Sequence, residues 1–433
     1  MHLHTLIGES LSTIEEVYCK ANANYPSLDD VDTPAFSERL LFNSDVVNAS
    51  LVIVSAAEQL IASIKHPQIS LWDTLMAYQL PTALAYAERF NLVEVLNKAG
   101  PSGIHLHELA EITQSSEARL VNIPILNRSS NIKYRGTDGK AAFVAIAGDE
   151  MFKAAAFLAQ AYIDSPSSRS TSASESAFSH AVGSAGTSYF DWLNEPANAQ
   201  YLDRFQHAIL GVSGIEHPDA LYEAYPWASL AQDSFVVDVG GGLGSITLKL
   251  VNSFPHLCYL IQDLPFVVSA AANYWLQANP DAWKSKRVQA SSHNFFDTQP
   301  VKNAAVFLVR AVCHDHPDAV VIQILSLLRA AAQSYTILII GDHIMPYACS
   351  DDTSAAEIVG AQSRLVPSPL LANAGKASSA AFYMDMTMQA MFNARERTLD
   401  SQIELLKASG WSVDRVSLNA FSRFGYIIAV PAY

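Results

Sequence analysis

Residues 309–320, VRAVCHDHPDAV, gather side chains that can titrate near neutral pH or bind a metal. Three roles suit them: a metal site, a catalytic base with supporting acids, or a polar turn after a strand. Histidine has an ordinary pKa of about 6.5, which suits proton transfer at neutral pH, and it is also the commonest metal ligand. The side chains concerned are Cys313, His314, Asp315, His316 and Asp318.

A metal site is the main alternative to a catalytic base here. In an extended segment His314 and His316 face one side and Asp315 faces the other, and two histidines with a carboxylate can bind iron or zinc. Pro317 interrupts the extended run, however, and no third ligand follows from the spacing. We therefore predict no metal, while three further side chains remain candidates as ligands: His293, Asp342 and His343.

The elements that position this stretch begin at Phe235, where short β-branched runs start to alternate with amphipathic helical stretches. This alternation predicts a parallel sheet with crossover helices. Two final runs are joined too closely for a parallel crossover, so they predict an antiparallel hairpin at one sheet edge. The fold class expected is α/β, a doubly wound sheet with an antiparallel edge strand. The predicted strands are 235–239, 258–263, 287–291, 305–312, 336–342, 411–418 and 426–432.

The preceding residues predict a mostly helical region. Apolar side chains recur at helical spacing through residues 1 to about 100. Leu51–Ile64 is the longest apolar run; it carries Glu58 and predicts a buried helix rather than a membrane span. Helices this apolar can be buried in their own domain or in a partner subunit, and both alternatives stay open. Gly103–Leu126 is typical of the helix–turn–helix of a winged-helix unit, although Pro124 interrupts it.

A serine- and alanine-rich stretch, Ser165–Ser188, predicts a mobile loop or linker. We therefore expect three segments: a helical, winged-helix-like dimerisation domain over 1–160, a linker with cleft helices over 161–225, and a ligand-binding domain over 226–433.

Composition excludes several classes of partner. The 433 residues carry 27 Lys+Arg against 42 Asp+Glu, a net charge of −15. This balance argues against nucleic acid and against an anionic membrane surface, because both need clustered cations. The four cysteines form no CxxC pair, and the N-terminus shows no basic region followed by an apolar core. We therefore expect a cytoplasmic enzyme.

A glycine-rich loop follows the first strand of the sheet, in FVVDVGGGLGSITLKL. Glycine allows a tight turn and lets the backbone approach a ligand closely. The spacing is GxGxG rather than the dinucleotide fingerprint GxGxxG, which disfavours a nicotinamide dehydrogenase. Asp238 before the loop would repel a pyrophosphate but suits a cation such as the amino-acid end of S-adenosylmethionine. Asp263, which ends the next strand, is placed to accept hydrogen bonds from ribose hydroxyls.

A chain of motifs from about residue 220 onward resembles one known family. The segments are YPWASL with FVVDVGGGLG, IQDLPFVV, HNFFDTQPV, FLVRAVCHDHPD, ILIIGDHIMP and FNARERT, in that order. They resemble the S-adenosylmethionine-dependent O-methyltransferases that act on phenolic and polyketide-like small molecules in plants and fungi. The resemblance implies a class I methyltransferase domain with a Rossmann-like fold, the cofactor S-adenosyl-L-methionine, a small hydroxylated substrate and a homodimer.

The resemblance also implies roles for individual residues. His314 matches the general base, and Asp342 and Glu396 match acids that flank and orient it; their alternative role is in structural ion pairs or helix caps. Asp315, Asp385, Met384 and Met388 are assigned to the substrate. The residues assigned to the cofactor are Asp238, Gly240, Gly242, Asp263, Leu264, Asn294, Phe295, Arg310 and Ser213.

Two positions depart from the family pattern. Asn294 replaces an aspartate that faces the adenine, and His316 replaces a tryptophan beside the cofactor. The function expected is methylation of a hydroxyl, with His314 taking its proton. The alternative is a cyclase or pericyclase that binds the same cofactor on the same fold without methylating.

Overall fold

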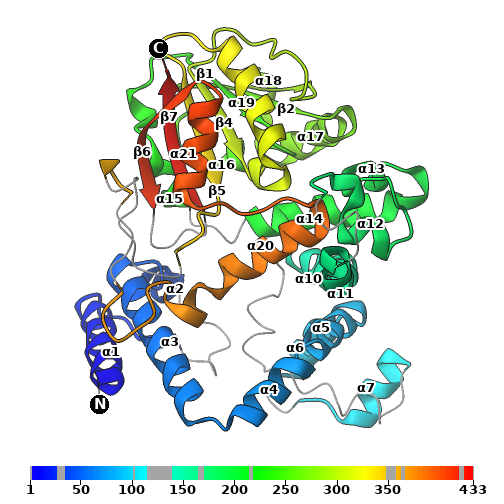
Figure 1. The fold of residues 1–433 in the computed structure, drawn as a ribbon, viewed down its shortest axis with the longest axis vertical. Helices are drawn as coiled ribbons and strands as arrows, with labels where there is room; N and C mark the ends of the chain where they lie inside the picture. The colour runs from blue at the N-terminus through cyan, green and yellow to red at the C-terminus, as the bar shows by residue number, and fades with distance from the viewer. Residues whose placement is uncertain are drawn as a thin grey trace. The chain divides into compact units, whose positions relative to one another are not determined.

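The computed structural model describes residues 2–26, 35–100, 103–114, 139–163, 170–213, 218–347, 357–361, 366–418 and 424–432. These residues belong to two compact units, drawn in Figure 1. Unit 1 comprises Met1–Ala159 and Phe178–Ile215, and unit 2 comprises Gln160–Ala177 and Glu216–Tyr433. The domain boundaries expected near residues 160 and 225 stay predictions.

Unit 2 contains a seven-stranded sheet in the order β3-β2-β1-β4-β5-β7-β6 (Figure 1). Strands β1 to β5 are parallel, and β7 runs antiparallel to both β5 and β6. The predicted α/β fold and its terminal hairpin are confirmed, and the reversed strand β7 lies between β5 and β6. The strands are β1 (Phe235–Val239), β2 (Cys258–Asp263), β3 (Val288–Ser292), β4 (Val306–Arg310), β5 (Ile337–Asp342), β6 (Trp411–Leu418) and β7 (Gly425–Pro431).

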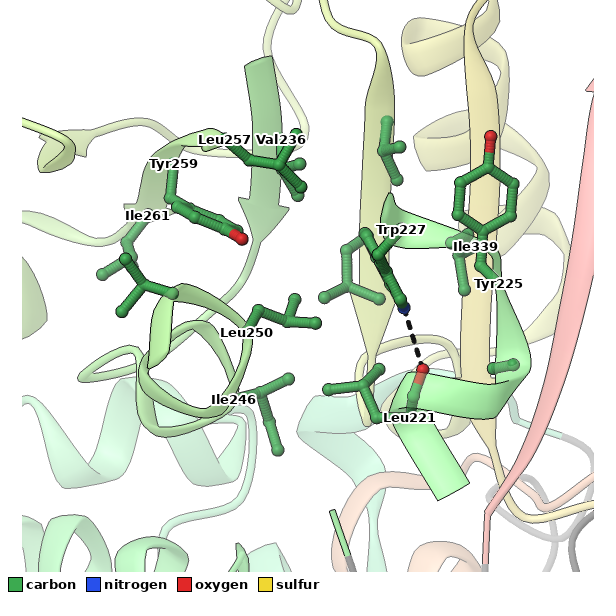
Figure 2. Close-up of a cluster of buried hydrophobic side chains, with 14 of the residues drawn as sticks. Leu221, Tyr225, Trp227, Val236, Ile246, Leu250, Leu257, Tyr259, Ile261 and Ile339 are labelled. Carbon is green, nitrogen blue, oxygen red and sulfur yellow. Dashed lines mark hydrogen bonds between the residues drawn. The ribbon is translucent and has the colours of Figure 1, made fainter. Parts of the chain in front are cut away.

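The central strands form because they bury side chains on both faces, as parallel strands do. In β4, Val306 and Leu308 join the hydrophobic cluster on one face, while Phe307 and Val309 join the cluster on the other. Figure 2 shows the first cluster, where Ile246 and Leu250 of a crossover helix pack with β-strand residues. The buried Trp227 indole satisfies its N–H by donating to the Leu221 carbonyl at 2.9 Å.

The helices of unit 2 connect and cover these strands. They are α15 (Pro218–Ala224), η5 (Trp227–Ser229), α16 (Ser245–Ser253), α17 (Pro265–Ala278), α18 (Pro280–Lys284), η6 (Cys313–Asp315), α19 (Asp318–Ala331), η8 (Gly375–Ser378), α20 (Ser379–Phe392) and α21 (Leu399–Ala408), with η3 (Ala173–Glu175) from the earlier segment.

Unit 1 is helical in the residues described, as the apolar spacing predicts. Ile14 and Tyr18 of α1 pack against Val46 and Ala49 of α3. The helices are α1 (His2–Lys20), α2 (Ala35–Leu40), α3 (Ser44–Ile64), α4 (Pro67–Met76), α5 (Gln79–Arg89), α6 (Leu92–Ala99), α7 (Leu106–Thr113), α10 (Lys140–Gly148), α11 (Glu150–Ile163), α12 (Ala177–Ala181), α13 (Tyr189–Leu193), η4 (Pro196–Asn198) and α14 (Ala199–Ser213).

Helix α3 contains the run Leu51–Ile64 that was predicted to be buried in its own domain or in a partner subunit. Only 17% of its most apolar window is buried within this chain. Ile64 at its end is 75% exposed. Among the described residues α1 packs against part of α3, and burial of the rest in a partner subunit stays a prediction. By length and composition alone, α3 is the one described helix that could cross a membrane.

The serine-rich stretch differs from its prediction where it is described. Residues 170–188 contain η3 and α12 in place of a mobile loop. Phe178 is fully buried and makes edge-to-face contacts with Tyr189 and Trp192, so one aromatic anchor orders a segment whose composition favours disorder. The predicted winged-helix segment lies mostly outside the described residues, which include only α7 from it.

Candidate active site

His314 lies in the short helix η6, just beyond the carboxyl end of β4. Its Nδ1 donates to Oε1 of Glu396 at 2.8 Å, and both residues are buried. Glu396 lies 82 residues further along the chain, between α20 and α21. This hydrogen bond selects the tautomer in which Nε2 carries the lone pair. The structure thus brings together the predicted base and one of its two predicted acids.

Acidic neighbours dominate the electrostatics of His314. Burial by itself lowers the pKa of the imidazole, but Asp315, Glu396 and Asp342 outweigh it and raise the pKa to about 10. Nε2 lies 3.6 Å from Oδ1 of Asp315. Burial in turn raises the pKa of Asp315 to about 6. The group is therefore a strongly basic imidazole held among acids.

Asp342 ends β5 beside this group and is 1% exposed. Burial raises the pKa of its carboxyl to about 7, against the opposing effect of His314. Within the described part of the chain, neither carboxyl oxygen has a hydrogen-bond partner. Glu396 is therefore the acid that orients His314 by a hydrogen bond, and an orienting role for Asp342 stays a prediction.

Asp385 of helix α20 holds the backbone of Glu396. Asp385 accepts a hydrogen bond from the backbone N–H of Glu396 at 2.9 Å through Oδ1. Its Oδ2 accepts from the Gln389 side chain at 2.6 Å, and the Tyr162 hydroxyl bonds to the same Gln389. Asp385, predicted as a substrate residue, thus has both oxygens engaged within the protein, Oδ1 by Glu396 and Oδ2 by Gln389.

Met384 and Met388 lie one turn apart on α20, on the same side of the helix. Met388 is 5% exposed and Met384 is half-buried. The more accessible Met384 suits contact with a flat ligand better than Met388, whose burial is typical of a core residue. Their predicted role in binding substrate stays a prediction.

His316 lies in an aromatic group. Its ring packs edge-to-face against Phe295 and Phe296, at 5.6 Å from each ring centre. Burial, together with the charges of His314 and Arg397, lowers the pKa of His316 to about 4. It is therefore a neutral aromatic wall at ordinary pH. In the part of the chain that the structure describes, no group of three or more His, Cys, Asp or Glu side chains is arranged to hold a metal ion.

The glycine loop lies directly beside the His314 turn. Gly240, Gly242 and Gly244 all have positive φ, at +68°, +60° and +82°, conformations that glycine adopts without strain. A Cβ on Gly240 would approach Val312 to 2.8 Å. Because Val312 immediately precedes Cys313 and His314, the loop and the His314 turn are neighbours within unit 2.

Two acids hold this loop in shape. The N–H of Gly242 donates to Oδ2 of Asp263 at 2.8 Å, and the N–H of Leu264 donates to Oδ1 at 2.7 Å. Asp238 accepts from the Thr247 hydroxyl at 2.6 Å and packs against Gly241. Burial raises the pKa of Asp238 to about 6. These contacts place Asp238 behind the loop, where it supports the backbone; direct contact with a ligand stays a prediction.

The remaining predicted cofactor residues all lie in unit 2, with one exception. Phe295 lies against Gly240, and the exposed Asn294 accepts the backbone N–H of Phe296 at 3.0 Å. Arg310 stacks on Phe424 at 4.0 Å and donates to the Tyr426 hydroxyl. The exception is Ser213, which ends α14 in unit 1 and whose side chain lies outside the described atoms.

Sequence reasoning missed two supports of the site. Gln262 and Gln299 exchange two buried side-chain hydrogen bonds, 3.0 and 2.8 Å long, which fix the segment carrying Asn294 and Phe295 to β2. Arg397 is 1% exposed and contacts the His314 turn. The position of Arg397 next to Glu396 in RERT was its one available sequence signal. The buried Gln262–Gln299 pair had none, because a buried amide pair leaves no pattern in a single sequence.

Comparisons with known proteins identify the family of this chain. The profile of the family described as the O-methyltransferase domain matches residues 168–412. An O-methyltransferase of Armillaria gallica is 31% identical, with 99% of this chain and 98% of that protein covered. A protein named 4-O-methyltransferase 1 from Phanerochaete chrysosporium is 30% identical, with 94% of this chain and 93% of that protein covered.

Solved structures share the fold at lower identity. The mitomycin 7-O-methyltransferase MmcR has a TM-score of 0.65 at 19% identity, and the match covers 87% of this chain and 99% of that one. LepI in complex with S-adenosylmethionine has a TM-score of 0.72 at 16% identity, covering 92% of this chain and 97% of that one.

Proposed function

Because the chain belongs to the O-methyltransferase family, as the match over residues 168–412 and the 31% identical relative show, we propose that it methylates a phenolic hydroxyl of a small secondary metabolite. S-adenosyl-L-methionine is the proposed methyl donor, and His314 is the proposed general base. Relatives named as O-methyltransferases from fungi, including a 4-O- and a 3-O-methyltransferase, support the hydroxyl acceptor.

The observation that carries this proposal is the buried 2.8 Å hydrogen bond from His314 Nδ1 to Glu396. It leaves Nε2 to accept a proton from the substrate. A phenol has a pKa of about 10, and the acidic neighbours raise the pKa of His314 above its ordinary value, so the imidazole is a stronger base towards a phenol than a free histidine. A cationic group bound nearby would oppose the surrounding acids and lower the His314 pKa, which increases the neutral form of the imidazole.

The residues around the glycine loop fit S-adenosyl-L-methionine, which supplies an electrophilic methyl group when bound. A Cβ on Gly242 would meet nothing within 4 Å, so the loop backbone is open on that side. The Asp263 carboxylate can accept further hydrogen bonds from a ribose, since its two oxygens have about four lone-pair sites. Phe295 and His316 offer ring faces and edges for a base, and Asn294 is exposed beside them. Solved neighbours complexed with S-adenosylmethionine support the same cofactor.

Adding one methyl group at Gly240 tests whether the glycine loop binds the cofactor. Gly240→Ala is expected to weaken S-adenosylmethionine binding about tenfold or more, because a left-handed residue with a Cβ costs about 1–2 kcal/mol and the Cβ would press on Val312. Gly183→Ala is the matched control: Gly183 has φ +69° and open space around its Cβ. Calorimetric titration of both variants measures the change. Equal affinity in the two variants would remove the loop from the cofactor site.

The reaction itself is tested with purified protein, methyl-labelled S-adenosylmethionine and a panel of phenols. The expected result is labelled product with the added mass of one methyl group, unaffected by a strong chelator. A substrate that is transformed without gaining a methyl mass would favour the cyclase or pericyclase alternative. Loss of activity on chelation would favour the metal alternative.

We also propose that the enzyme is a cytoplasmic homodimer formed through unit 1. Helices α3 and α4 expose a contiguous run of apolar side chains, and such surfaces mark interaction sites. Trp72 is 63% exposed. The described cysteines are free thiols, which supports a reducing compartment. The apolar surface of α3 and α4 also includes the exposed residues Ile61, Ile64, Ile69, Leu71 and Leu75.

Trp72→Glu is expected to convert a dimeric protein into a monomer, because a charge would be buried in the interface. Sedimentation velocity measures the change, and Tyr335→Glu in unit 2, at a site 59% exposed, is the control. A monomeric wild-type protein that binds neutral lipid vesicles through this surface would overturn the dimer and indicate a membrane contact instead.

A further inference from the structure

Arg397 is a fully buried arginine, among the largest side chains of the chain with less than 2% exposure. A buried charge is costly unless it is paired and hydrogen-bonded. Its Nε and Nη2 lie 2.9 and 2.8 Å from Oδ1 of Asp318, the first residue of α19. Arg395, half-exposed, donates to the other oxygen of Asp318 at 2.7 Å. The charge of Arg397 is thus balanced by one carboxylate, which is itself held at both oxygens.

The rest of the guanidinium reaches the turn that carries the base. Nη1 donates to the carbonyl of Cys313 at 2.8 Å, and Nη2 donates to the carbonyl of His316 at 2.6 Å. These carbonyls stand on either side of His314 and Asp315. Because a guanidinium is a rigid, planar fork, one side chain fixes both ends of the turn in a single geometry. A lysine has no such fork and could not hold both carbonyls and Asp318 in this way.

The backbone of Arg397 also contacts the segment that follows Asp342. Its carbonyl accepts the N–H of Met345 at 2.9 Å, and Ile344 and Arg397 form a parallel β-bridge. Met345 follows Asp342 by three residues. Glu396, the hydrogen-bond partner of His314, is the neighbour of Arg397 in the chain. The segments carrying His314, Asp342 and Glu396 therefore all meet at Arg397.

We propose that Arg397 is a positioning residue for the reaction, one that sets the orientation of His314 against Glu396 by fixing the two carbonyls around the His314 turn. The inference rests on the proposed role of His314 as base. Arg397 itself is buried and acts through His314, since its guanidinium is occupied by Asp318 and the two carbonyls. Only the arrangement of the turn, and with it the direction of the Nε2 lone pair, depends on the fork.

The test compares Arg397→Lys with Arg395→Lys. Both variants keep a positive charge near Asp318, but only the first removes the fork from the His314 turn. Arg397→Lys is expected to lower kcat about 10- to 100-fold, because the base is displaced, with the KM for S-adenosylmethionine within about threefold of wild type, since the glycine loop is untouched. Arg395→Lys is expected to keep wild-type kcat.

A spectroscopic readout separates this proposal from the proposed function. In protein labelled with nitrogen-15 histidine, the His314 signals are assigned by their loss in His314→Gln. Arg397→Lys is expected to move these signals and their titration towards those of an ordinary histidine, and Arg395→Lys to leave them in place. This measurement does not depend on methyl transfer, so it stands even if the substrate proposal fails.

If Arg397→Lys does not fold, Asp318→Asn takes its place, because it weakens the anchor of the fork and keeps the side-chain shape. A shifted His314 titration in that variant supports the proposal. A folded Arg397→Lys or Asp318→Asn with wild-type kcat and an unchanged His314 titration overturns it. If the His314 titration is unchanged in these variants and His314→Gln is inactive, the positioning role of Arg397 is contradicted, and the proposed role of His314 as base is not.

Discussion

Replacing His314 with glutamine is expected to lower kcat for methyl transfer by about 10²–10⁴-fold, the range that general bases supply. Glutamine keeps a polar side chain of similar length but cannot accept the phenolic proton at neutral pH. The glycine loop and Asp263 are untouched, so the dissociation constant for S-adenosylmethionine is expected to stay within about threefold of wild type. Steady-state kinetics and calorimetric titration measure the two quantities.

The control for this variant is His107→Gln. His107 is an exposed histidine on α7 whose ring faces Glu111, which makes it a histidine beside a glutamate without the burial of His314. We expect its kinetics to match wild type. Full activity of His314→Gln under the same conditions would show that another group, or solvent, takes the proton.

Replacing Glu396 with glutamine is expected to produce two separable effects. The first is a fall in the plateau value of kcat by about 10²-fold, because the neutral amide no longer fixes the imidazole tautomer. The second is a change in pH dependence. Activity requires the unprotonated imidazole, so kcat/KM rises as the pH passes the apparent pKa of His314, which acidic neighbours raise above its ordinary value.

The sign of the second effect follows from the charge removed. Glu396 stabilises the protonated imidazole through its hydrogen bond and its charge, so its loss lowers the pKa of His314. The rise in kcat/KM is therefore expected at lower pH in Glu396→Gln than in wild type. A pH series of initial rates measures this, with the exposed Glu404→Gln on α21 as control. A rise shifted to higher pH, or an unchanged plateau, would contradict the assignment of Glu396 as the orienting acid.

Much of the unit 2 fold could be predicted from local pattern. FVVDV and CYLIQD became β1 and β2 with the predicted bounds, because continuous β-branched runs bounded by turns have few other ways to be buried. The order of strands in the sheet, and the insertion of β7 between β5 and β6, required contacts between segments far apart in the chain.

Amino-acid composition alone did not predict the structure of two segments, because contacts with other parts of the chain decide it. The serine-rich stretch around residues 170–188 contains η3 and α12, because Phe178 is buried among aromatic rings. Helix α3 is apolar enough to be buried in its own domain or in a partner subunit, and among the described residues α1 packs against only part of its surface. In both cases the structure depends on the surface against which a side chain packs. Apolar content alone does not specify that surface.

For the site, the sequence by itself indicated which residues could carry chemistry: a histidine after a strand, a glycine loop after another, and acids at nearby strand ends. The tertiary structure decided which of them are in contact. Glu396 hydrogen-bonds His314, Asp342 makes no side-chain oxygen hydrogen bond among the described residues, and Asp385 accepts a hydrogen bond from the backbone of Glu396. Arg397, whose one sequence signal was its position next to Glu396, joins the segments that carry them. The physical reason is that hydrogen bonding and desolvation act over a few ångströms in space, between residues far apart in the chain, such as Cys313 and Arg397, which are 84 positions apart.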